Sequence, residues 1–383
     1  MKTVNLINAR VFDGEAVHEN ARVRIEDGRV LELAKNGLGM AEASVSIDLE
    51  GRMLAPGLID IQVNGGGGVL FNDAPTVETI RTIGAAHRRF GTTGFLPTLI
   101  SSTARTMADA IRAVRQAMEE KVPGVLGIHL EGPFLAATKR GIHDAGHFRT
   151  IDEDGFEQVT GLGIGRTLLT VAPEMTGPDW IQRLANAGII VFAGHSNAGY
   201  EQVREALDAG LRGFTHLFNA MSPFESRSPG MVGTALSDRE SYAGLICDGY
   251  HLHPASFAAA VAAKGSTHCL LVTDAMATVG AETGDFEWNG ETVLARGGCC
   301  RLPDGSLAGS DLDMMTAVRN AMRYTGMNRF EALRMASTYP AQAMDLDDEL
   351  GYIRPGYRAS FVELDNDMNL AATWIDGERQ EAG

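Results

Sequence analysis

Cysteine is scarce in this chain of 383 residues, which contains only four: Cys247, Cys269, Cys299 and Cys300. They are too few and too irregularly spaced for a disulfide framework, and none forms a C-x-x-C pair, so a zinc site built from thiolates is not expected. A chain of this length can bury a sizeable core without such cross-links.

Long apolar runs and a surplus of positive charge are also missing. No stretch reaches the ~18 consecutive apolar residues of a membrane helix, and Asn5, Asn8 and Arg10 interrupt any signal-peptide core near the N-terminus. The formal net charge of −16 has the wrong sign for general binding to nucleic acid or to an anionic membrane. We therefore expect a cytoplasmic protein.

Glycine is abundant instead, with 45 residues, against a usual share of ~7%. Because the hydrophobic fraction is an ordinary 44%, the excess predicts many tight loops on a packed scaffold. Two glycine-containing stretches only look like motifs. No G-x-x-x-x-G-K-[ST] follows residues 65–68, which excludes a nucleotide P-loop. In residues 194–199 the final glycine of the G-x-S-x-G nucleophile elbow falls one position late, which argues against a serine hydrolase.

The middle of the chain alternates apolar runs with helical periodicity, as in the helices predicted at 77–90 and 201–209. Eight apolar runs occur, at 58–63, 93–100, 125–130, 167–172, 189–193, 213–217, 243–247 and 269–273. Such alternation predicts a parallel sheet, and eight units favour a (β/α)8 TIM-like barrel. An open doubly wound sheet is the alternative, but no G-x-G-x-x-G follows the early strands.

Both ends of the chain have a different sequence pattern, which predicts short strands separated by turn dipeptides such as Asp13-Gly14 and Asp376-Gly377. We expect residues 1–53 and 351–383 to form one small β-sandwich domain beside a catalytic barrel at 54–350. Turn signals within 286–307 predict a hairpin insertion near the barrel mouth.

Polar residues stand where six of the eight predicted barrel strands end. In strand order they are Gln62 and Asn64, Glu131, His195, His216, Asp248 and His251, and Asp274. Taken singly, a histidine at a strand end is more often structural than a ligand. In a barrel, however, the carboxyl ends of the strands meet at one face and line the active site. Their convergence there favours a metal site.

Glu131, His195 and His216 match a known composition of catalytic zinc sites, which is two imidazoles and one carboxylate with an open position for water. Asp274 is then the candidate general base, because a divalent cation makes water acidic enough for a carboxylate to take its proton. Nitrogen and oxygen donors also suit Fe²⁺, Co²⁺ and Mn²⁺.

Six stretches carry a family resemblance: PGLID at 56–60, HLEGPF at 129–134, KRGIH at 139–143, GHSNA at 194–198, THLFNAM at 215–221 and VTDA at 272–275. Together they show that the chain resembles the N-acetylglucosamine-6-phosphate deacetylases of the amidohydrolase superfamily, nearly from end to end. The resemblance implies a barrel of the metal-dependent hydrolase type. It also implies hydrolysis of N-acetyl-D-glucosamine 6-phosphate to D-glucosamine 6-phosphate and acetate, in amino-sugar catabolism or cell-wall recycling.

The resemblance also implies roles for single residues. It makes Glu131, His195 and His216 the metal ligands and Asp274 a catalytic residue, and it has His143 polarise the acetyl carbonyl. Sugar and phosphate would be held by Ile142, His143, Asn219, Ala220, Arg227, His251, Leu307, Ala308 and Gly309. Arg227 would enter from the neighbouring subunit of a homodimer or tetramer, although by its surroundings in the sequence it is as readily a solvated loop arginine.

One departure from the superfamily pattern concerns the end of the first barrel strand. Many amidohydrolases carry His-x-His there, which supplies a second metal position, whereas this chain has Gln62-Val63-Asn64. Neutral amides are poor ligands beside imidazole, so we expect the second position to be vacant. The prediction is one divalent cation per subunit, with Zn²⁺ favoured.

Two other functions compete with this interpretation. The protein could be another amidohydrolase, acting on a cyclic amide or an unphosphorylated N-acetyl amino sugar, or a catalytically silent barrel that serves as a binding protein. The intact set of Glu131, His195, His216 and Asp274 argues against a silent barrel.

Overall fold

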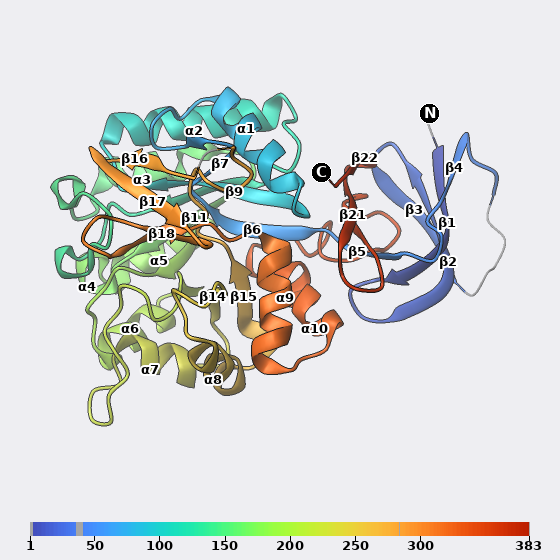
Figure 1. Cartoon of the computed structure of the whole chain (residues 1–383). Coiled ribbons are helices and arrows are strands. Elements are labelled where there is room, and N and C mark those ends of the chain that lie inside the picture. The colour runs from blue at the N-terminus through green and yellow to red at the C-terminus, as the bar shows by residue number, and fades with distance from the viewer. Residues whose placement is uncertain (1–2, 36–40, 283, 383) are drawn as a thin grey trace.

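The computed structural model describes residues 3–35, 41–282 and 284–382. Its centre is a sheet of eight parallel strands in the order β15-β14-β13-β12-β11-β10-β9-β6 (Figure 1). Along the chain these are β6 (Leu58–Val63), β9 (Thr92–Ile100), β10 (Gly127–Glu131), β11 (Arg166–Val171), β12 (Ile190–Ala193), β13 (Gly213–Phe214), β14 (Tyr242–Ile246) and β15 (Cys269–Val272).

The sheet closes on itself at its two outermost strands. Val63, the last residue of β6, forms a parallel bridge with Ala275 just beyond β15, and the amide of Asp274 donates to the carbonyl of Gln62 at 3.0 Å. The prediction of a barrel rather than an open doubly wound sheet is therefore confirmed. The closing contacts lie at the carboxyl ends of the strands, which is the end where the polar residues gather.

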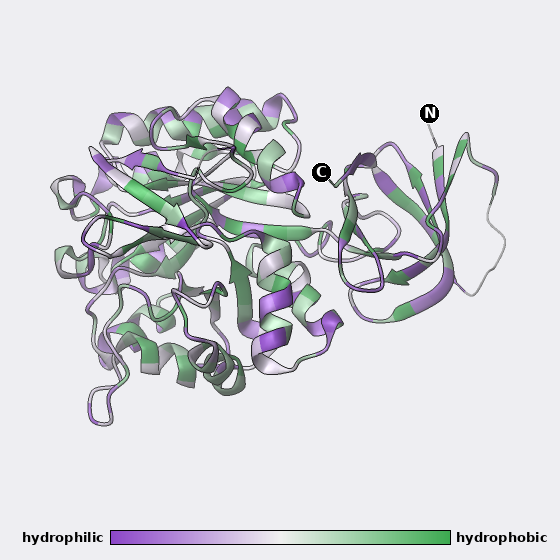
Figure 2. Ribbon diagram, viewed as in Figure 1, coloured by the Kyte–Doolittle hydropathy of each residue, from purple (hydrophilic) through white to green (hydrophobic). Residues whose placement is uncertain are grey.

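Helices surround the barrel and present one apolar side to it. They are α1 (Val77–Arg88), α2 (Ala104–Glu119), α3 (Glu153–Val159), α4 (Pro173–Thr176), α5 (Pro178–Asn186), α6 (Tyr200–Asp208), α7 (Gly230–Ser237), α8 (Pro254–Lys264), α9 (Met314–Thr325), α10 (Arg329–Ala336) and α11 (Thr338–Ala343). Figure 2 shows β15 as hydrophobic along its length, whereas α9 alternates hydrophobic and hydrophilic turns. This difference is expected, because strands of a parallel barrel are covered on both faces and an outer helix on one only.

β13 is shorter than the predicted strand 213–217. The chain leaves the extended conformation at His216, whose φ is 35°, and at Phe218, whose φ is 81°. The apolar pattern continues through these residues because they stay buried or half-buried, so hydrophobicity alone does not reveal where the strand stops.

Segments from the two chain ends share a second sheet, which lies beside the barrel (Figure 1). Its order is β22-β21-β20-β5-β1-β2-β3, and β4 also pairs with β1. The strands are β1 (Thr3–Phe12), β2 (Val17–Glu26), β3 (Arg29–Ala34), β4 (Val45–Asp48), β5 (Met53–Pro56), β20 (Phe361–Leu364), β21 (Leu370–Ile375) and β22 (Glu378–Glu381). Side chains from both ends, among them Leu6, Val23 and Trp374, pack into one core.

The small β domain built from both termini is thereby confirmed. The division into residues 1–53, 54–350 and 351–383 stays a proposal. Because β5 pairs with both β1 and β20, we extend its first segment through Pro56.

The predicted insertion is a four-stranded antiparallel sheet rather than a single hairpin. Its strands are β16 (Phe286–Trp288), β17 (Glu291–Arg296), β18 (Cys299–Arg301) and β19 (Leu307–Ser310), paired in that order. The indole of Trp288 donates to the carbonyl of Ile142 at 3.0 Å, which ties this sheet to the barrel mouth. A further short pair, β7 (Gly65–Gly66) and β8 (Val69–Leu70), follows β6. Among the described helices, none combines the length and apolarity needed to cross a membrane.

Candidate active site

Three of the predicted site residues share an uncommon backbone conformation just past their strands. His195, His216 and Asp274 have φ values of 48°, 35° and 53°, in the left-handed region that residues other than glycine seldom adopt. Such strain costs free energy and tends to persist at functional sites. Each of these residues lines the cavity at the barrel mouth, so the strained turns place their side chains in one space.

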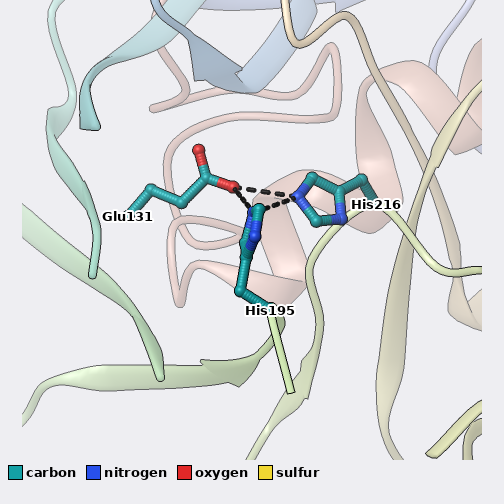
Figure 3. A group of neighbouring side chains, drawn as sticks. All are labelled: Glu131, His195 and His216. Atoms are coloured by element: carbon teal, nitrogen blue, oxygen red, sulfur yellow. Dashed lines mark hydrogen bonds and ion pairs between the residues drawn. The ribbon is translucent and has the colours of Figure 1, made fainter. Parts of the chain in front are cut away.

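Glu131, His195 and His216 form a compact, buried cluster (Figure 3). Oε1 of Glu131 lies 3.1 Å from Nε2 of His195 and 2.9 Å from Nε2 of His216, and the two Nε2 atoms are 3.0 Å apart. All three residues are at most 5% exposed. Burial opposes ionisation of Glu131, but the hydrogen bonds of the two histidines outweigh it and hold the pKa of Glu131 well below its usual range.

The hydrogen bonds around His195 prepare this cluster for a cation. Nδ1 of His195 lies 2.8 Å from the carbonyl oxygen of Lys139. A carbonyl only accepts, so Nδ1 carries a proton, and Nε2, which faces Glu131, is the nitrogen left to turn its lone pair to a cation when one is bound. Two imidazoles and a carboxylate that converge in this way fit a divalent metal ion.

Asp274 is held by the two amides that replace the superfamily's histidines. Its Oδ1 accepts from Nδ2 of Asn64 at 2.7 Å and from Nε2 of Gln62 at 3.1 Å. Nε2 of Gln62 also lies 3.4 Å from Oε1 of Glu131. Burial and, next, the charge of Glu131 raise the pKa of Asp274 to about 6. That the second metal position is vacant stays a prediction. The sequence did not indicate that both amides would hydrogen-bond to Asp274.

Three further polar residues support the site: Asp60 and Ser101, which were not recognised from the sequence, and Asp248, which was noted there at a predicted strand end. Asp60 is fully buried on β6 and accepts from the hydroxyl of Thr273 at 2.5 Å; burial raises its pKa to about 7. Ser101 lies 2.9 Å from Nδ1 of His143, and Asp248 lies 2.6 Å from Nδ1 of His251. Of the two that were not recognised, only Asp60 had a signal of its own, as an acid inside an apolar run.

The cavity at the barrel mouth contains most of the residues that the resemblance implied. Its lining comprises Ile100, Glu131, Gly141, Ile142, His143, His195, His216, Asn219, Ala220, His251, Asp274, Leu307 and Gly309. Ala308 is completely buried beside it and is not part of the lining. Among the described residues, no lysine or arginine lines the cavity.

Arg227 is the predicted binding residue that this chain does not bring to the cavity. It is exposed, as are its neighbours from Pro223 to Ser228, and the yellow-green loop before α7 projects from the barrel (Figure 1). Phe224 in the same loop is 63% exposed, which is unusual for a large apolar side chain.

A closed parallel barrel with a carboxylate and two histidines at its mouth, and an aspartate after the eighth strand, defines a metal-dependent hydrolase. The chain belongs to the amidohydrolase family, whose model matches residues 53–379.

Known proteins similar to the chain agree with this assignment. An N-acetylgalactosamine-6-phosphate deacetylase of a Shewanella species is 46% identical over 85% of this chain and 82% of that protein. An N-acetylglucosamine-6-phosphate deacetylase of Haemophilus influenzae is 34% identical over 98% and 99% of the two chains. The resemblance indicated by the sequence motifs is confirmed.

Solved structures give the same result for the fold. The N-acetylglucosamine-6-phosphate deacetylase of Pasteurella multocida aligns with a TM-score of 0.94 at 33% identity, covering 99% of this chain and 100% of that one. A mutant of the Mycobacterium smegmatis deacetylase, in complex with N-acetyl-D-glucosamine 6-phosphate, aligns with a TM-score of 0.90 at 29% identity, covering 99% of each chain.

Proposed function

We propose that this protein hydrolyses N-acetyl-D-glucosamine 6-phosphate to D-glucosamine 6-phosphate and acetate, in amino-sugar catabolism or cell-wall recycling. The observation that carries the proposal is the cluster of Glu131, His195 and His216 beside Asp274 in one buried cavity. The similarity to deacetylases of phosphorylated amino sugars over nearly the whole chain supports the substrate class.

Glu131, His195 and His216 would hold one divalent cation, for which Zn²⁺ is proposed and Fe²⁺, Co²⁺ or Mn²⁺ also suit the donors. When bound, the cation polarises the acetyl carbonyl and acidifies the attacking water. Asp274 takes the proton of that water and then delivers it to the leaving amine, because an amide nitrogen leaves poorly without a proton.

His143 is proposed to donate a hydrogen bond to the acetyl oxygen, where negative charge develops. Burial and the neighbouring His195 hold the pKa of His143 well below 6.5, so its ring is neutral. A neutral ring carries one proton, so His143 donates from Nε2 only if Nδ1 is unprotonated. Nδ1 lies 2.9 Å from the hydroxyl of Ser101, which also lies 3.2 Å from the carbonyl of Glu131, so the proposed tautomer requires Ser101 to give its one proton to His143 rather than to that carbonyl.

The phosphate requires a cationic partner, and the described residues that line the cavity of one chain include no lysine or arginine. We propose a homodimer, or a tetramer, in which Arg227 on the exposed loop enters the neighbouring subunit's cavity and grips the phosphate bidentately. His251 would add a second donor. Ile142, Asn219, Ala220, Leu307 and Gly309 would contact the sugar, with Ala308 behind them. We also propose a cytoplasmic location, where the four buried, free cysteines would stay reduced.

N-acetyl-D-galactosamine 6-phosphate is the second candidate substrate, because the 46% identical relative is named for it. The two sugars differ only in the orientation of the hydroxyl at C4, so they share the acetamide and the phosphate on which the proposed chemistry depends.

The experiment that tests the function is acetate release by the purified, metal-loaded protein, with Asp274→Asn as the matched inactive control. Four compounds are compared: both N-acetylhexosamine 6-phosphates, unphosphorylated N-acetylglucosamine, and a cyclic amide. We expect the highest kcat/KM with N-acetyl-D-glucosamine 6-phosphate. A preference for the galacto epimer would establish the second candidate. Turnover of the cyclic amide alone, or of none of the four, would refute the proposal.

A further inference from the structure

The two amides at the end of β6 both hydrogen-bond to the reacting carboxylate. Nδ2 of Asn64 and Nε2 of Gln62 both donate to the same atom, Oδ1 of Asp274, at 2.7 and 3.1 Å. Oδ2 accepts no hydrogen bond from the described residues. Asp274 lines the cavity. Its two carboxylate oxygens are therefore inequivalent there, because only Oδ1 is held by hydrogen bonds from the described residues.

The amides themselves are fixed by the seam that closes the barrel. The backbone carbonyl of Gln62 accepts from the amide of Asp274 at 3.0 Å, and the backbone amide of Asn64 donates to the carbonyl of Ala275 at 2.9 Å. Gln62 thus holds Asp274 through both its main chain and its side chain. Gln62 and Asn64 are 2% and 1% exposed, so water cannot take over their bonds.

Gln62 has a second, electrostatic role. Asp274 and Glu131 are both buried carboxylates that share one cavity, and their like charges oppose each other. Nε2 of Gln62 lies between them, 3.1 Å from Oδ1 of Asp274 and 3.4 Å from Oε1 of Glu131. A neutral donor in this position offsets part of the repulsion without itself becoming a ligand.

We infer that Gln62 and Asn64 are positioning residues for Asp274: by holding Oδ1 they stop the carboxylate from rotating and leave Oδ2 as the atom that takes and returns the proton. This inference rests on the proposed function and deepens it. It gives a function to Gln62 and Asn64. As poor metal ligands, they would otherwise indicate only that the second metal position is vacant.

The test uses two near-isosteric variants without donors, Asn64→Leu and Gln62→Met, in the full-length, metal-loaded protein. A carboxylate that rotates freely spends less time in the reactive orientation, so we expect kcat to fall roughly 10- to 100-fold. KM and the metal content should stay within about twofold to threefold, because neither substrate contacts nor ligands are removed. Asn320→Leu is the matched control: it removes another buried amide, which donates to the carbonyl of Cys247 at 2.7 Å, and should leave kcat within a few-fold.

A double-mutant cycle separates positioning from a general structural role. In the Asp274→Asn background, adding Asn64→Leu should cause no further loss of kcat, because both changes act through one carboxylate. Independent additive losses would overturn the inference, as would full kcat in both single variants.

Crystal structures of the two single variants give a readout that needs no substrate. We expect Asp274 in a rotated or split orientation in at least one of them. An unchanged Asp274 carboxylate in both would overturn the inference even if turnover fell. If the wild-type protein releases acetate from neither sugar phosphate, the proposed function fails, and the orientation of Asp274 still decides whether the amides position it.

Discussion

Replacement of Asp274 by asparagine should remove activity and at the same time stabilise the metal-free protein. Asparagine has nearly the same shape, and its side-chain oxygen can accept both donors that now hold Oδ1, Asn64 at 2.7 Å and Gln62 at 3.1 Å. Its NH₂ group then occupies the position of Oδ2 and cannot accept a proton. The fold and the cluster of Glu131, His195 and His216 should be unchanged.

The loss of activity follows from the two proton transfers assigned to Asp274. General acid–base assistance contributes roughly 10²–10⁴-fold, and here one residue both takes the proton from water and returns it to the amine. We therefore expect kcat to fall by about 10⁴-fold or more. Metal content should not change, because Asp274 is not among the three predicted ligands.

The gain in stability follows from the raised pKa of Asp274. Its folded pKa of about 6 lies above the unfolded value of 3.8, so the unfolded chain releases this proton more readily. The stability that the protonated group contributes is fully present below about pH 4 and is lost as the pH rises through about 6. A difference of about two pH units corresponds to about 3 kcal/mol, which the asparagine variant should recover at pH 7.

Urea unfolding of the metal-free wild type and variant at pH 4 and pH 7, together with acetate release, would test both effects. The variant should be more stable at pH 7 and about equal at pH 4. In the metal-loaded proteins the gain should shrink, because the cation offsets the repulsion between Asp274 and Glu131. Activity within tenfold of wild type would remove Asp274 from the mechanism, and equal stability at both pH values would contradict the electrostatic argument.

Three further predictions concern the metal, the phosphate and the small β domain. Elemental analysis should find about one tightly bound divalent cation per chain, and His195→Ala or His216→Ala should bring it close to zero; two tight equivalents in active protein would contradict this. Arg227→Ala should lower kcat/KM roughly 10- to 150-fold for the phosphorylated sugar but little for the unphosphorylated one, and equal losses would make the arginine structural. In mixed dimers of Arg227→Ala and Asp274→Asn subunits, activity should partly return because one site carries neither change; no recovery in verified mixed dimers would place the arginine in its own chain's cavity. Glu363→Ala should lower the free energy of unfolding by about 3 kcal/mol, because this fully buried carboxylate pairs with Arg52 and Arg379; a change below about 1 kcal/mol in urea unfolding would show that the network contributes little.

The barrel was predictable because its signal is local and repeated. Each buried strand needs a short apolar run, and each run before a helix indicates one more βα unit. Strand ends were less accurate, as β13 shows, because His216 and Phe218 leave the extended conformation while the apolar pattern continues. The insertion was recognised from its turns, but its four-strand pairing depends on contacts that turn residues do not encode.

For the site, the sequence by itself determined which residue types meet at the barrel mouth. Parallel strands share one carboxyl end, so Glu131, His195, His216 and Asp274 had to converge, and the family motifs around them supplied the expected chemistry. This inference needed only the order of the strands and the residues that follow them.

Only the tertiary structure decided how those residues are held. Asn64 and Asp274 are 210 positions apart, and Ser101 and His143 are 42 apart. Sequence pattern tells which face a side chain occupies, but not which atom it will lie within 3 Å of. That depends on the closure of the barrel and on strained turns, which arise from the packing of the whole chain. The same reason explains why Arg227 could be named from the family resemblance while its absence from its own chain's cavity emerged only in three dimensions.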